Sequence, residues 1–354
     1  MKVCVLGAGN VGLLIAKDLS QDYEVSIADR SQERLKLAAD FATPIELDAS
    51  NFERLVDCMK KFDLIVGALP GRFGYNVLKA ALKAQRDIVD VSFMPEDPLQ
   101  LDEDAKTAKI RMVVDAGFAP GLSNVLMGHI QSELGLIEEG WINVGGLPKD
   151  PKPPLYYRVV FSPYDLIEEY TRPARIIKNG EIVSVDPLGT INEILLKNFQ
   201  FESFVSDGLR TLLKTINANN LVENTLRWKG HLEKIKVLRE LGFFKKENID
   251  FTMRVILPLM SFESDDFSIM EVYGRNDEEE LRYFMYDEAQ GGFTSMARAT
   301  GYVTAICTRI LAEHDFEPGV IPPELFGMEG ALFKEIIKEV RKRGILLEEH
   351  QRGL

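Results

Sequence analysis

Three glycines near the start of the chain have the spacing needed to bind a phosphate group. Gly7, Gly9 and Gly12 follow the apolar run Val3–Leu6 in a G-x-G-x-x-G arrangement, which is typical of a strand, a tight turn and a helix start. The unpaired N–H groups and the dipole of such a helix bind the pyrophosphate of a dinucleotide. The alternative is an α/β protein that uses them only as turn residues. We predict that the dinucleotide site includes Gly7, Gly9, Asn10, Val11 and Gly12.

A carboxylate stands where the ribose of that dinucleotide would lie. The apolar run Val25–Ala28 ends at Asp29, 17 residues after Gly12, close to the distance at which a ribose-binding acid is expected. Its oxygens would accept from the ribose hydroxyls and repel a 2′-phosphate, which favours NAD over NADP. Arg30 follows directly and could instead pair with a 2′-phosphate, so NADP stays open as the second choice.

These residues require a sheet that brings strand ends together. Alternating strand and helix patterns run to about residue 120, and a capping box at Ser50–Glu53 starts one of the helices. The further strands are Ile45–Leu47, Asp63–Gly67, Asp87–Val91 and Arg111–Asp115. This order predicts a doubly wound parallel sheet, in which ligands bind beyond the carboxyl ends of the strands. The further cofactor-binding candidates at these ends are Asp48, Ala68, Leu69, Pro70, Ser92 and Phe93.

Asp48 and the segment Ala68–Pro70 each suggest a specific contact with the cofactor. Asp48 could accept from the adenine amino group, although a helix cap or a surface acid explains it as well. The small apolar segment Ala68–Pro70 suits backbone contact with the nicotinamide ribose, and its alternative is a plain turn after a strand.

The pattern changes beyond residue 121. Gly121–Leu136 reads as a helix, and Asn179–Gly180 between two apolar runs predicts a hairpin, since a type I′ turn needs positive φ at both positions. A helix rich in small residues, Thr294–Ala312, should return to the first domain. We therefore expect an α/β protein with a Rossmann-type domain (1–122), an inserted α+β substrate and catalytic domain (123–290) and C-terminal helices packing back on the Rossmann domain (291–354).

Composition limits the partners. The 354 residues carry a net charge of −13, which argues against nucleic acid and anionic membranes as partners. No apolar stretch reaches the ~20 residues of a membrane span, and no signal-peptide pattern opens the chain. We expect a cytoplasmic protein. Cys4, Cys58 and Cys307 lie far apart in sequence and are expected to be reduced core thiols rather than disulfide or metal ligands, so no metal site is predicted.

Three segments resemble one enzyme family. They are Asp115–Asn124 (DAGFAPGLSN), Ser162–Arg175 (SPYDLIEEYTRPAR) and Thr225–Lys234 (TLRWKGHLEK). Together they resemble the saccharopine dehydrogenase family, most closely its L-lysine 6-dehydrogenase branch, and the likeness runs nearly end to end. The first is similar to the family's D-x-G-x-x-P-G turn and the third to its T-L-R-[YW]-x-G-H signature. Trp228 and Lys229 stand where the family usually has Tyr and Pro.

The resemblance implies a dinucleotide domain, an inserted α+β catalytic domain that often forms a homodimer, and oxidation at a carbon that bears nitrogen. Such a carbon yields hydride only after its ammonium loses a proton to a base. His231 has the pKa range for this role and stands at a helix start whose dipole favours neutral imidazole, although a structural histidine is equally plausible. Asp115 could orient the amine or relay its proton, or could cap the helix that follows.

An amino acid carboxylate calls for an arginine, whose forked donors match two oxygens. Arg227 is the favoured candidate, the alternative being a surface ion pair, and Arg172 is the second, unless it is a solvated helix end. Glu169 could pair with the substrate ammonium or, three positions away on a helix, with Arg172.

The sequence thus predicts NAD-dependent oxidative deamination of a side-chain amine, with L-lysine giving 2-aminoadipate 6-semialdehyde and ammonia. The alternative is a saccharopine- or carboxynorspermidine-type reductase or dehydrogenase that uses NADP. A second alternative is a nucleotide-binding protein without catalysis.

Overall fold

The computed structural model describes residues 1–160 and 162–353. The chain divides into two compact units, of which the first is Met1–His129 with Ala297–Gly344 and the second is Ile130–Met296 with Ile345–Leu354. The first unit thus holds the N-terminal part and most of the C-terminal helices that the sequence analysis expected to return to it. The last ten residues belong to the second unit instead.

The first unit is built on a seven-stranded parallel sheet with the order β15-β6-β5-β4-β1-β2-β3. The run from β6 to β3 is the strand order of a doubly wound dinucleotide fold, so the predicted fold class is confirmed. The strands are β1 (Lys2–Leu6), β2 (Glu24–Asp29), β3 (Thr43–Glu46), β4 (Leu64–Gly67), β5 (Asp87–Asp90), β6 (Arg111–Val113) and β15 (Gly319–Ile321).

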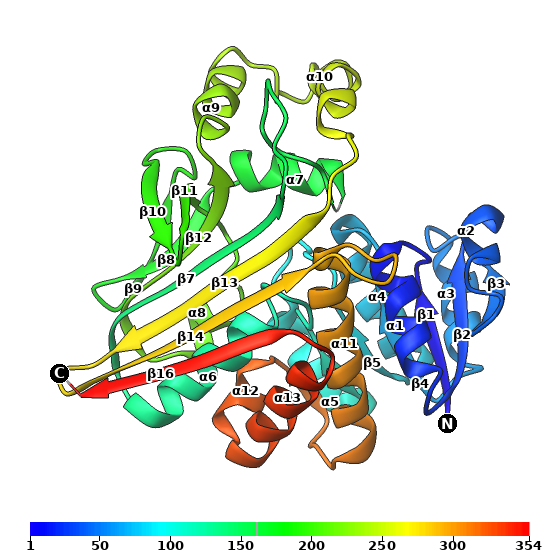
Figure 1. Cartoon of the computed structure of the whole chain (residues 1–354). Coiled ribbons are helices and arrows are strands. Elements are labelled where there is room, and N and C mark those ends of the chain that lie inside the picture. The colour runs from blue at the N-terminus through cyan, green and yellow to red at the C-terminus, as the bar shows by residue number, and fades with distance from the viewer. Residues whose placement is uncertain (161, 354) are drawn as a thin grey trace. The chain divides into compact units, whose positions relative to one another are not determined.

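Helices connect these strands or lie before and after them in the chain (Figure 1). They are α1 (Asn10–Leu19), α2 (Gln32–Lys36), α3 (Phe52–Met59), α4 (Gly71–Ala84), η1 (Pro98–Leu101), α5 (Asp102–Ala108), α6 (Leu122–Leu134), α11 (Ser295–Glu313), α12 (Glu324–Met328) and α13 (Gly330–Lys342). A methyl group added at Gly301 of α11 would lie 3.1 Å from the Leu14 side chain of α1. The helix α11 therefore packs on the first helix of the same unit.

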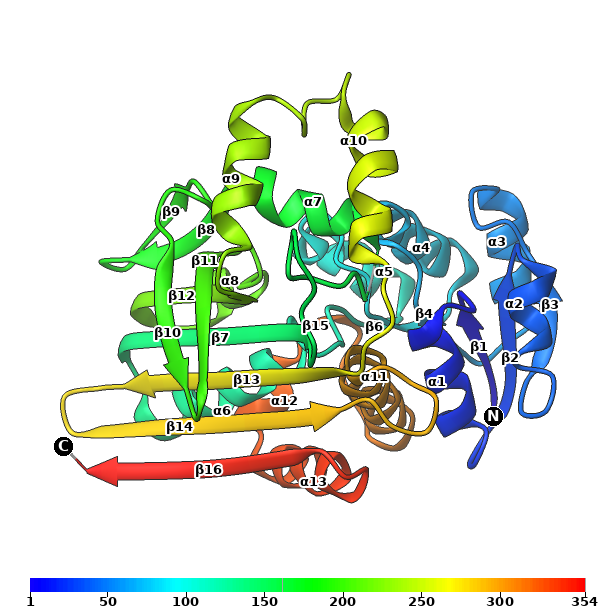
Figure 2. The same ribbon diagram turned by 45° about the horizontal axis from the view of Figure 1, so that its top comes forward.

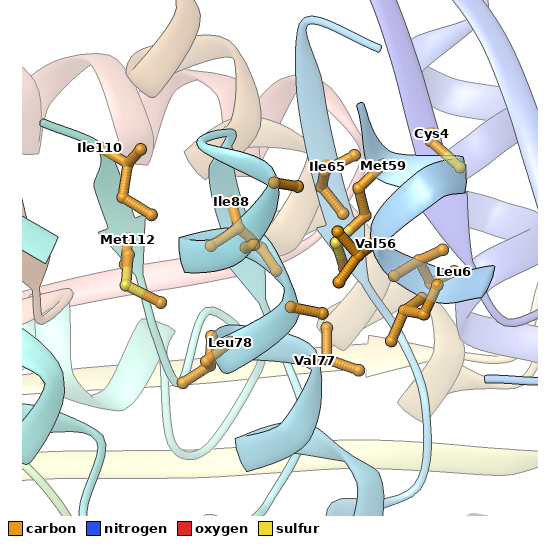
Figure 3. Packing of buried hydrophobic residues seen from close by; sticks show 14 of the residues in the cluster. Cys4, Leu6, Val56, Met59, Ile65, Val77, Leu78, Ile88, Ile110 and Met112 are labelled. Carbon is orange, nitrogen blue, oxygen red and sulfur yellow. The ribbon is translucent and has the colours of Figure 1, made fainter. Parts of the chain in front are cut away.

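The core of the first unit lies between α3, α4, α5 and one face of the sheet (Figure 3). Cys4 and Leu6 point to this face from β1, because alternate residues of a strand share a face. Val56 and Met59 of α3 and Val77 of α4 pack against them, and all five are almost completely buried. Burying such an apolar face contributes about 2 kcal/mol for each large side chain. The three cysteines are free and buried.

One local prediction in this unit was wrong. The capping residue of α3 is Asn51, whose side chain accepts from the Arg54 N–H at 3.1 Å, rather than Ser50. The Ser50 hydroxyl donates instead to the Asp48 carboxylate at 2.7 Å, because a charged acceptor binds a hydroxyl more strongly than a neutral one.

The second unit is built on a nine-stranded mixed sheet, which confirms the inserted α+β domain. Its order is β10-β11-β12-β7-β13-β14-β16, with the hairpin β8–β9 attached to β12; only β12 and β7 run parallel. The strands are β7 (Ile137–Pro148), β8 (Ala174–Lys178), β9 (Glu181–Val185), β10 (Asn192–Leu196), β11 (Phe199–Val205), β12 (Ala218–Trp228), β13 (Asp266–Arg275), β14 (Glu279–Glu288) and β16 (Leu346–Gly353).

The predicted hairpin is confirmed, since Asn179 and Gly180 have φ of 52° and 78° between β8 and β9. The prediction that the C-terminal segment is helical was wrong. Leu346–Gly353 forms β16 at the edge of the sheet, antiparallel to β14. The helices of this unit are α7 (Pro163–Thr171), α8 (Leu212–Thr215), α9 (Leu232–Glu240), α10 (Ile249–Ile256) and η2 (Leu257–Met260). Figure 2 shows α7, α9 and α10 gathered at one end of the sheet.

No helix in the described part of the chain is long and apolar enough to cross a membrane.

Candidate functional site

The glycine turn between β1 and α1 has the close contacts that only glycine permits. Gly7 has φ of +108°, and a Cβ built on it would lie 2.5 Å from the Ala68 carbonyl oxygen. A Cβ on Gly12 would lie 1.9 Å from the carbonyl oxygen of Gly7. The turn and the first turn of α1 are therefore held together through backbone contacts, as the G-x-G-x-x-G spacing predicted.

The start of α1 is open to a ligand. Gly9 is the N-cap residue of this ten-residue helix, no side chain caps it, and the first turn contains no acidic residue. No heavy atom lies within 4 Å of a Cβ built on Gly9. There is therefore free space beside Gly9, at the positive end of the helix dipole. This arrangement fits the pyrophosphate of a dinucleotide.

Asp29 ends β2 beside this turn and holds two segments together. Its Oδ2 accepts from the Ala8 N–H at 2.7 Å, and its Oδ1 accepts from the Ser31 N–H at 2.8 Å. Each carboxylate oxygen keeps a further lone pair that can accept from a ribose hydroxyl. The neighbouring Arg30 is exposed. Sequence reasoning missed Arg34, whose Nη1 lies 3.4 Å from Asn10 Oδ1 and adds a second cation on this side.

The other cofactor candidates lie after neighbouring strands on the same edge of the sheet. Ala68, Leu69 and Pro70 link β4 to α4 and are half-buried. Ser92 follows β5 together with Phe93, and both its N–H, at 2.9 Å, and its hydroxyl donate to Asp90 Oδ1.

Two acidic residues on this edge accept hydrogen bonds from a nearby serine, Asp90 from Ser92 and Asp48 from Ser50. The buried Asp90 was not singled out from the sequence. Asp48 follows β3, and hydrogen bonds from Ser50 lower the pKa of its exposed carboxyl.

Asp115 also lies on this edge, in the first unit. It follows β6 with φ of +51° and a fully buried side chain. Its carbonyl oxygen accepts from the Gly117 N–H at 3.0 Å, so it is part of a tight turn that leads to α6. A positive φ costs a residue with a side chain about 1 kcal/mol, which is often tolerated at functional sites. The other catalytic candidates belong to the second unit.

In the second unit, Arg227, Glu169 and His231 come together around Tyr170. Arg227 Nη2 lies 2.6 Å from Glu169 Oε2, and its Nε donates to the Tyr170 hydroxyl oxygen at 2.9 Å. The Tyr170 hydroxyl lies 2.9 Å from His231 Nε2, and His231 Nδ1 lies 2.6 Å from the Leu155 carbonyl oxygen. The three predicted residues and one unpredicted tyrosine thus form one hydrogen-bonded network.

Burial sets the charges of this network. The His231 side chain is fully buried, which together with the nearby Arg227 lowers its pKa to about 3. The ring is therefore neutral, as the sequence analysis expected, although burial rather than a helix dipole is the main cause. Burial opposes the charge of Arg227, but Tyr170, Tyr157 and Glu169 together raise its pKa. Burial also raises the pKa of Glu169, and Arg227 counteracts this shift.

The aromatic surroundings of Arg227 were not foreseen. Its guanidinium lies 4.4 Å from the ring centre of Tyr157 and 5.5 Å from that of Phe204. Such cation–π contacts favour a desolvated cation. Spacing in the sequence gives no signal for these contacts, because Tyr157 and Phe204 lie far from Arg227 along the chain.

Arg172 lies beside Asp207 and does not pair with Glu169. Its Nε lies 3.5 Å from Asp207 Oδ2, and Arg175 donates to both oxygens of the same carboxylate at 2.8 Å. The suggested pair between Glu169 and Arg172 is therefore wrong, since Glu169 forms its ion pair with Arg227. Burial lowers the pKa of Arg172, and Asp207 counteracts this shift.

Within residues 1–160 and 162–353, no group of three or more His, Cys, Asp or Glu side chains is arranged to hold a metal ion.

Known proteins resemble both units. A family model described as the saccharopine dehydrogenase NADP binding domain matches residues 3–113, and one described as the saccharopine dehydrogenase C-terminal domain matches residues 117–345. Saccharopine dehydrogenase [NADP(+), L-glutamate-forming] of Pyricularia oryzae is 26% identical over 271 residues, which are 72% of this chain and 60% of that protein. The mitochondrial alpha-aminoadipic semialdehyde synthase of Mus musculus is 26% identical over 267 residues, covering 70% of this chain and 29% of that protein.

A solved structure shares the fold. The apo saccharopine dehydrogenase (L-Glu forming) of Saccharomyces cerevisiae aligns with a TM-score of 0.81 over 99% of both chains, at 20% identity. The curated relatives are longer, and the chain spans about 60% of the length of the Pyricularia protein. Because the C-terminal family model alone covers more than half of the chain, the chain belongs to the saccharopine dehydrogenase family.

Proposed function

We propose that this protein is a dinucleotide-dependent oxidoreductase that acts on a carbon–nitrogen bond of an amino acid, with a saccharopine-type reaction as the main candidate. The observation that carries the proposal is the match of residues 3–113 and 117–345, in this order, to the NADP-binding and C-terminal domain models of this family. The open, uncapped start of α1 at Gly9 supports the dinucleotide part independently.

In this reaction a secondary amine joins two amino acid skeletons. Oxidation of the bond gives an imine, and addition of water then releases glutamate and 2-aminoadipate 6-semialdehyde. The names of the two curated relatives contain this amino acid and this aldehyde. When bound, the nicotinamide supplies the hydride acceptor. The chain itself must bind the charged substrate, take a proton from the amine and return one to the leaving nitrogen.

Named residues are candidates for these tasks. The amides of Asn10, Val11 and Gly12 would hold the pyrophosphate, and Asp29 with Arg30 would border the adenosine ribose. We keep Asp115 as a candidate for orienting the amine. The predicted role of Arg227 as the carboxylate-binding residue stays a prediction; its 2.6 Å ion pair with Glu169 means that a substrate carboxylate would have to share the guanidinium.

NADP is the first choice of cofactor because the family model and the Pyricularia relative are both described with it. The exposed Arg30 and the nearby Arg34 could pair with a 2′-phosphate. One observation favours a second candidate, NAD-linked deamination of lysine: the Asp29 carboxylate at the end of β2 would repel that phosphate. The two candidates therefore differ in nucleotide as well as in substrate.

One assay separates them. The protein is incubated with NADP or NAD and with saccharopine, lysine, ornithine or a diamine, while absorbance of the reduced nucleotide, glutamate and ammonia are measured together. Turnover of saccharopine with release of glutamate supports the main candidate. Turnover of lysine with release of ammonia supports the second. If nucleotide binds but no amine is oxidised, both are overturned in favour of a binding protein without catalysis. The predicted homodimer is tested separately by analytical ultracentrifugation.

A further inference from the structure

We propose that Glu169 is the group of the second unit that exchanges a proton with the substrate amine, and that Tyr170 and His231 are positioning residues that act on it through Arg227. The inference rests on the proposed function for the identity of the amine. It replaces the sequence-based expectation that His231 itself meets the substrate.

Exposure decides which group a substrate can reach. The side chain of Glu169 is 18% exposed, whereas that of Arg227 is 2% exposed. Tyr170 and His231 are completely buried behind them. Of these four side chains, that of Glu169 is the most exposed to a ligand in solvent. Such a ligand cannot touch the imidazole, whose nitrogens both face partners inside the protein.

The hydrogen bonds have one consistent direction. The Leu155 carbonyl can only accept, so His231 Nδ1 carries the proton and Nε2 is left as an acceptor. The Tyr170 hydroxyl donates to that Nε2, and its oxygen accepts from Arg227 Nε. Arg227 also donates from Nη1 to the Leu226 carbonyl oxygen at 2.9 Å. With Nε and Nη1 fixed in this way, Nη2 is presented to the carboxylate of Glu169.

Three separate elements supply these groups. Glu169 and Tyr170 are neighbours on α7, Arg227 stands near the end of β12, and His231 immediately precedes α9. Because β12 pairs with β11 and β7, Arg227 is anchored in the sheet. The carboxylate on the last turn of α7 is therefore held against a rigid element, as a proton-transferring group requires.

The electrostatic surroundings suit this role. Arg227 and Arg172 favour the charged form of Glu169, while burial and Asp165 oppose it, and the net effect raises the pKa of its carboxyl. Tyr157 and Tyr170 also lie near it, and burial raises the pKa of both phenols, so they stay neutral. A carboxylate whose pKa is moved toward neutrality takes and returns protons more readily near neutral pH.

The proton balance is simple. The substrate ammonium gives one proton to the Glu169 carboxylate, which leaves a neutral amine and a carboxylic acid. The amine lone pair forms the C=N bond as hydride leaves carbon for the oxidised nucleotide. Water then adds to the C=N bond and loses one proton to solvent, which leaves a neutral carbinolamine. The carboxylic acid returns its proton to the nitrogen, so the carboxylate is restored. The C–N bond then breaks as the hydroxyl oxygen forms the C=O bond and its proton passes to the leaving amine.

The first test is Glu169→Gln, which keeps the shape of the side chain and removes the carboxylate that takes up and returns the proton. We expect kcat on the active substrate to fall by about 100-fold or more, with nucleotide affinity unchanged. Arg227→Met should move the acidic limb of the kcat/KM profile to higher pH, because the cation that favours the carboxylate is lost. A Glu169→Gln variant that keeps kcat within threefold of the wild type would overturn the assignment of Glu169.

Positioning is tested by paired variants of His231. A glutamine places its amide near the position of Nε2, whereas an asparagine places it near Nδ1. His231→Gln should therefore retain an acceptor for Tyr170 and more kcat than His231→Asn. Tyr170→Phe should shift the acidic limb in the same direction as Arg227→Met. The matched control is Tyr273→Phe, which removes a 2.8 Å hydrogen bond to Glu280 beside Arg282 elsewhere in the unit; it should change nothing.

A measurement without substrate separates this inference from the proposed function. The carboxyl of Glu169 is titrated by ¹³C NMR, and its signal is identified by its loss in Glu169→Gln. A pKa above the usual ~4.3 of glutamate, and higher again in Arg227→Met, supports the inference even if no amine in the panel is oxidised. An ordinary pKa, or one that Arg227→Met leaves unchanged, overturns it.

Discussion

The hydroxyl of Tyr170 lies 2.9 Å from Nε2 of His231, on a ring whose Nδ1 lies 2.6 Å from the Leu155 carbonyl oxygen. The histidine thus donates at one nitrogen and accepts at the other, which only the neutral ring can do. Protonation would place a second donor against the hydroxyl and a second buried charge near Arg227. Burial, with the nearby Arg227, lowers the pKa of His231, and the hydrogen bond to Leu155 only partly opposes this shift.

The first prediction is a loss of stability in acid. Unfolded histidine has a pKa of ~6.5, so between that value and about 3 the unfolded chain binds a proton that native His231 does not. The free energy of unfolding must therefore fall as pH falls through this window. Between pH 7 and pH 5 the wild type should lose about 2 kcal/mol more than His231→Gln in urea unfolding.

The control for this prediction is His314→Gln, because the His314 side chain is 40% exposed and lies beside Glu335. That variant should keep the acid sensitivity of the wild type. Equal sensitivity in His231→Gln and the wild type would mean that His231 accepts a proton in the native state.

The second prediction concerns nucleotide choice. Asp29→Asn removes the charge next to the ribose and keeps one oxygen to accept from the Ala8 or Ser31 N–H. Without the repulsion of a 2′-phosphate, the ratio of Kd for NADP to Kd for NAD should fall about tenfold, equivalent to 1.4 kcal/mol. Calorimetric titration of both nucleotides measures it. Asp48→Asn, at the end of the next strand, is the control; an unchanged ratio in Asp29→Asn would mean that Asp29 only holds the turn together.

The third prediction tests the corrected helix cap. Asn51→Ala should destabilise the protein by about 1 kcal/mol, because the Arg54 N–H loses its acceptor. Ser50→Ala should cost less, since it removes only an exposed hydrogen bond to Asp48. Urea midpoints of the two variants decide the order. The reverse order would restore Ser50 as the capping residue.

Most strands of the first unit could be predicted from the sequence. Each buried parallel strand there is a short apolar run, as in Leu64–Gly67, and helical periodicity separates the runs. The strand β15 was missed because Gly319–Ile321 is too short to show a period. The strand β16 was missed because Leu346–Gly353 lies at a sheet edge, where polar side chains are tolerated and little alternation is left.

The candidate site was predictable only in part. The glycine turn could be identified because its residues are consecutive. The network of the second unit joins residues 57 and 61 positions apart, Tyr170 with Arg227 and Tyr170 with His231. Spacing in the sequence does not encode such contacts. Residue type suggested a catalytic histidine, a substrate-binding arginine and a glutamate that could pair with the substrate ammonium. It could not show that Glu169 is the most exposed of the three side chains.

The last prediction separates two glycines of the same motif. Gly9 has φ of −71°, which any residue adopts, and open space at its Cβ position, so Gly9→Ala should fold with nearly wild-type stability. Its methyl group would occupy the space beside the uncapped amides, and dinucleotide affinity should fall at least about tenfold, or 1.4 kcal/mol. Gly12→Ala forces a Cβ against the Gly7 backbone at 1.9 Å and should cost about 3 kcal/mol of stability. Urea unfolding and calorimetric titration of both variants give the two quantities. If Gly9→Ala binds dinucleotide as tightly as the wild type, the phosphate does not lie at the start of α1.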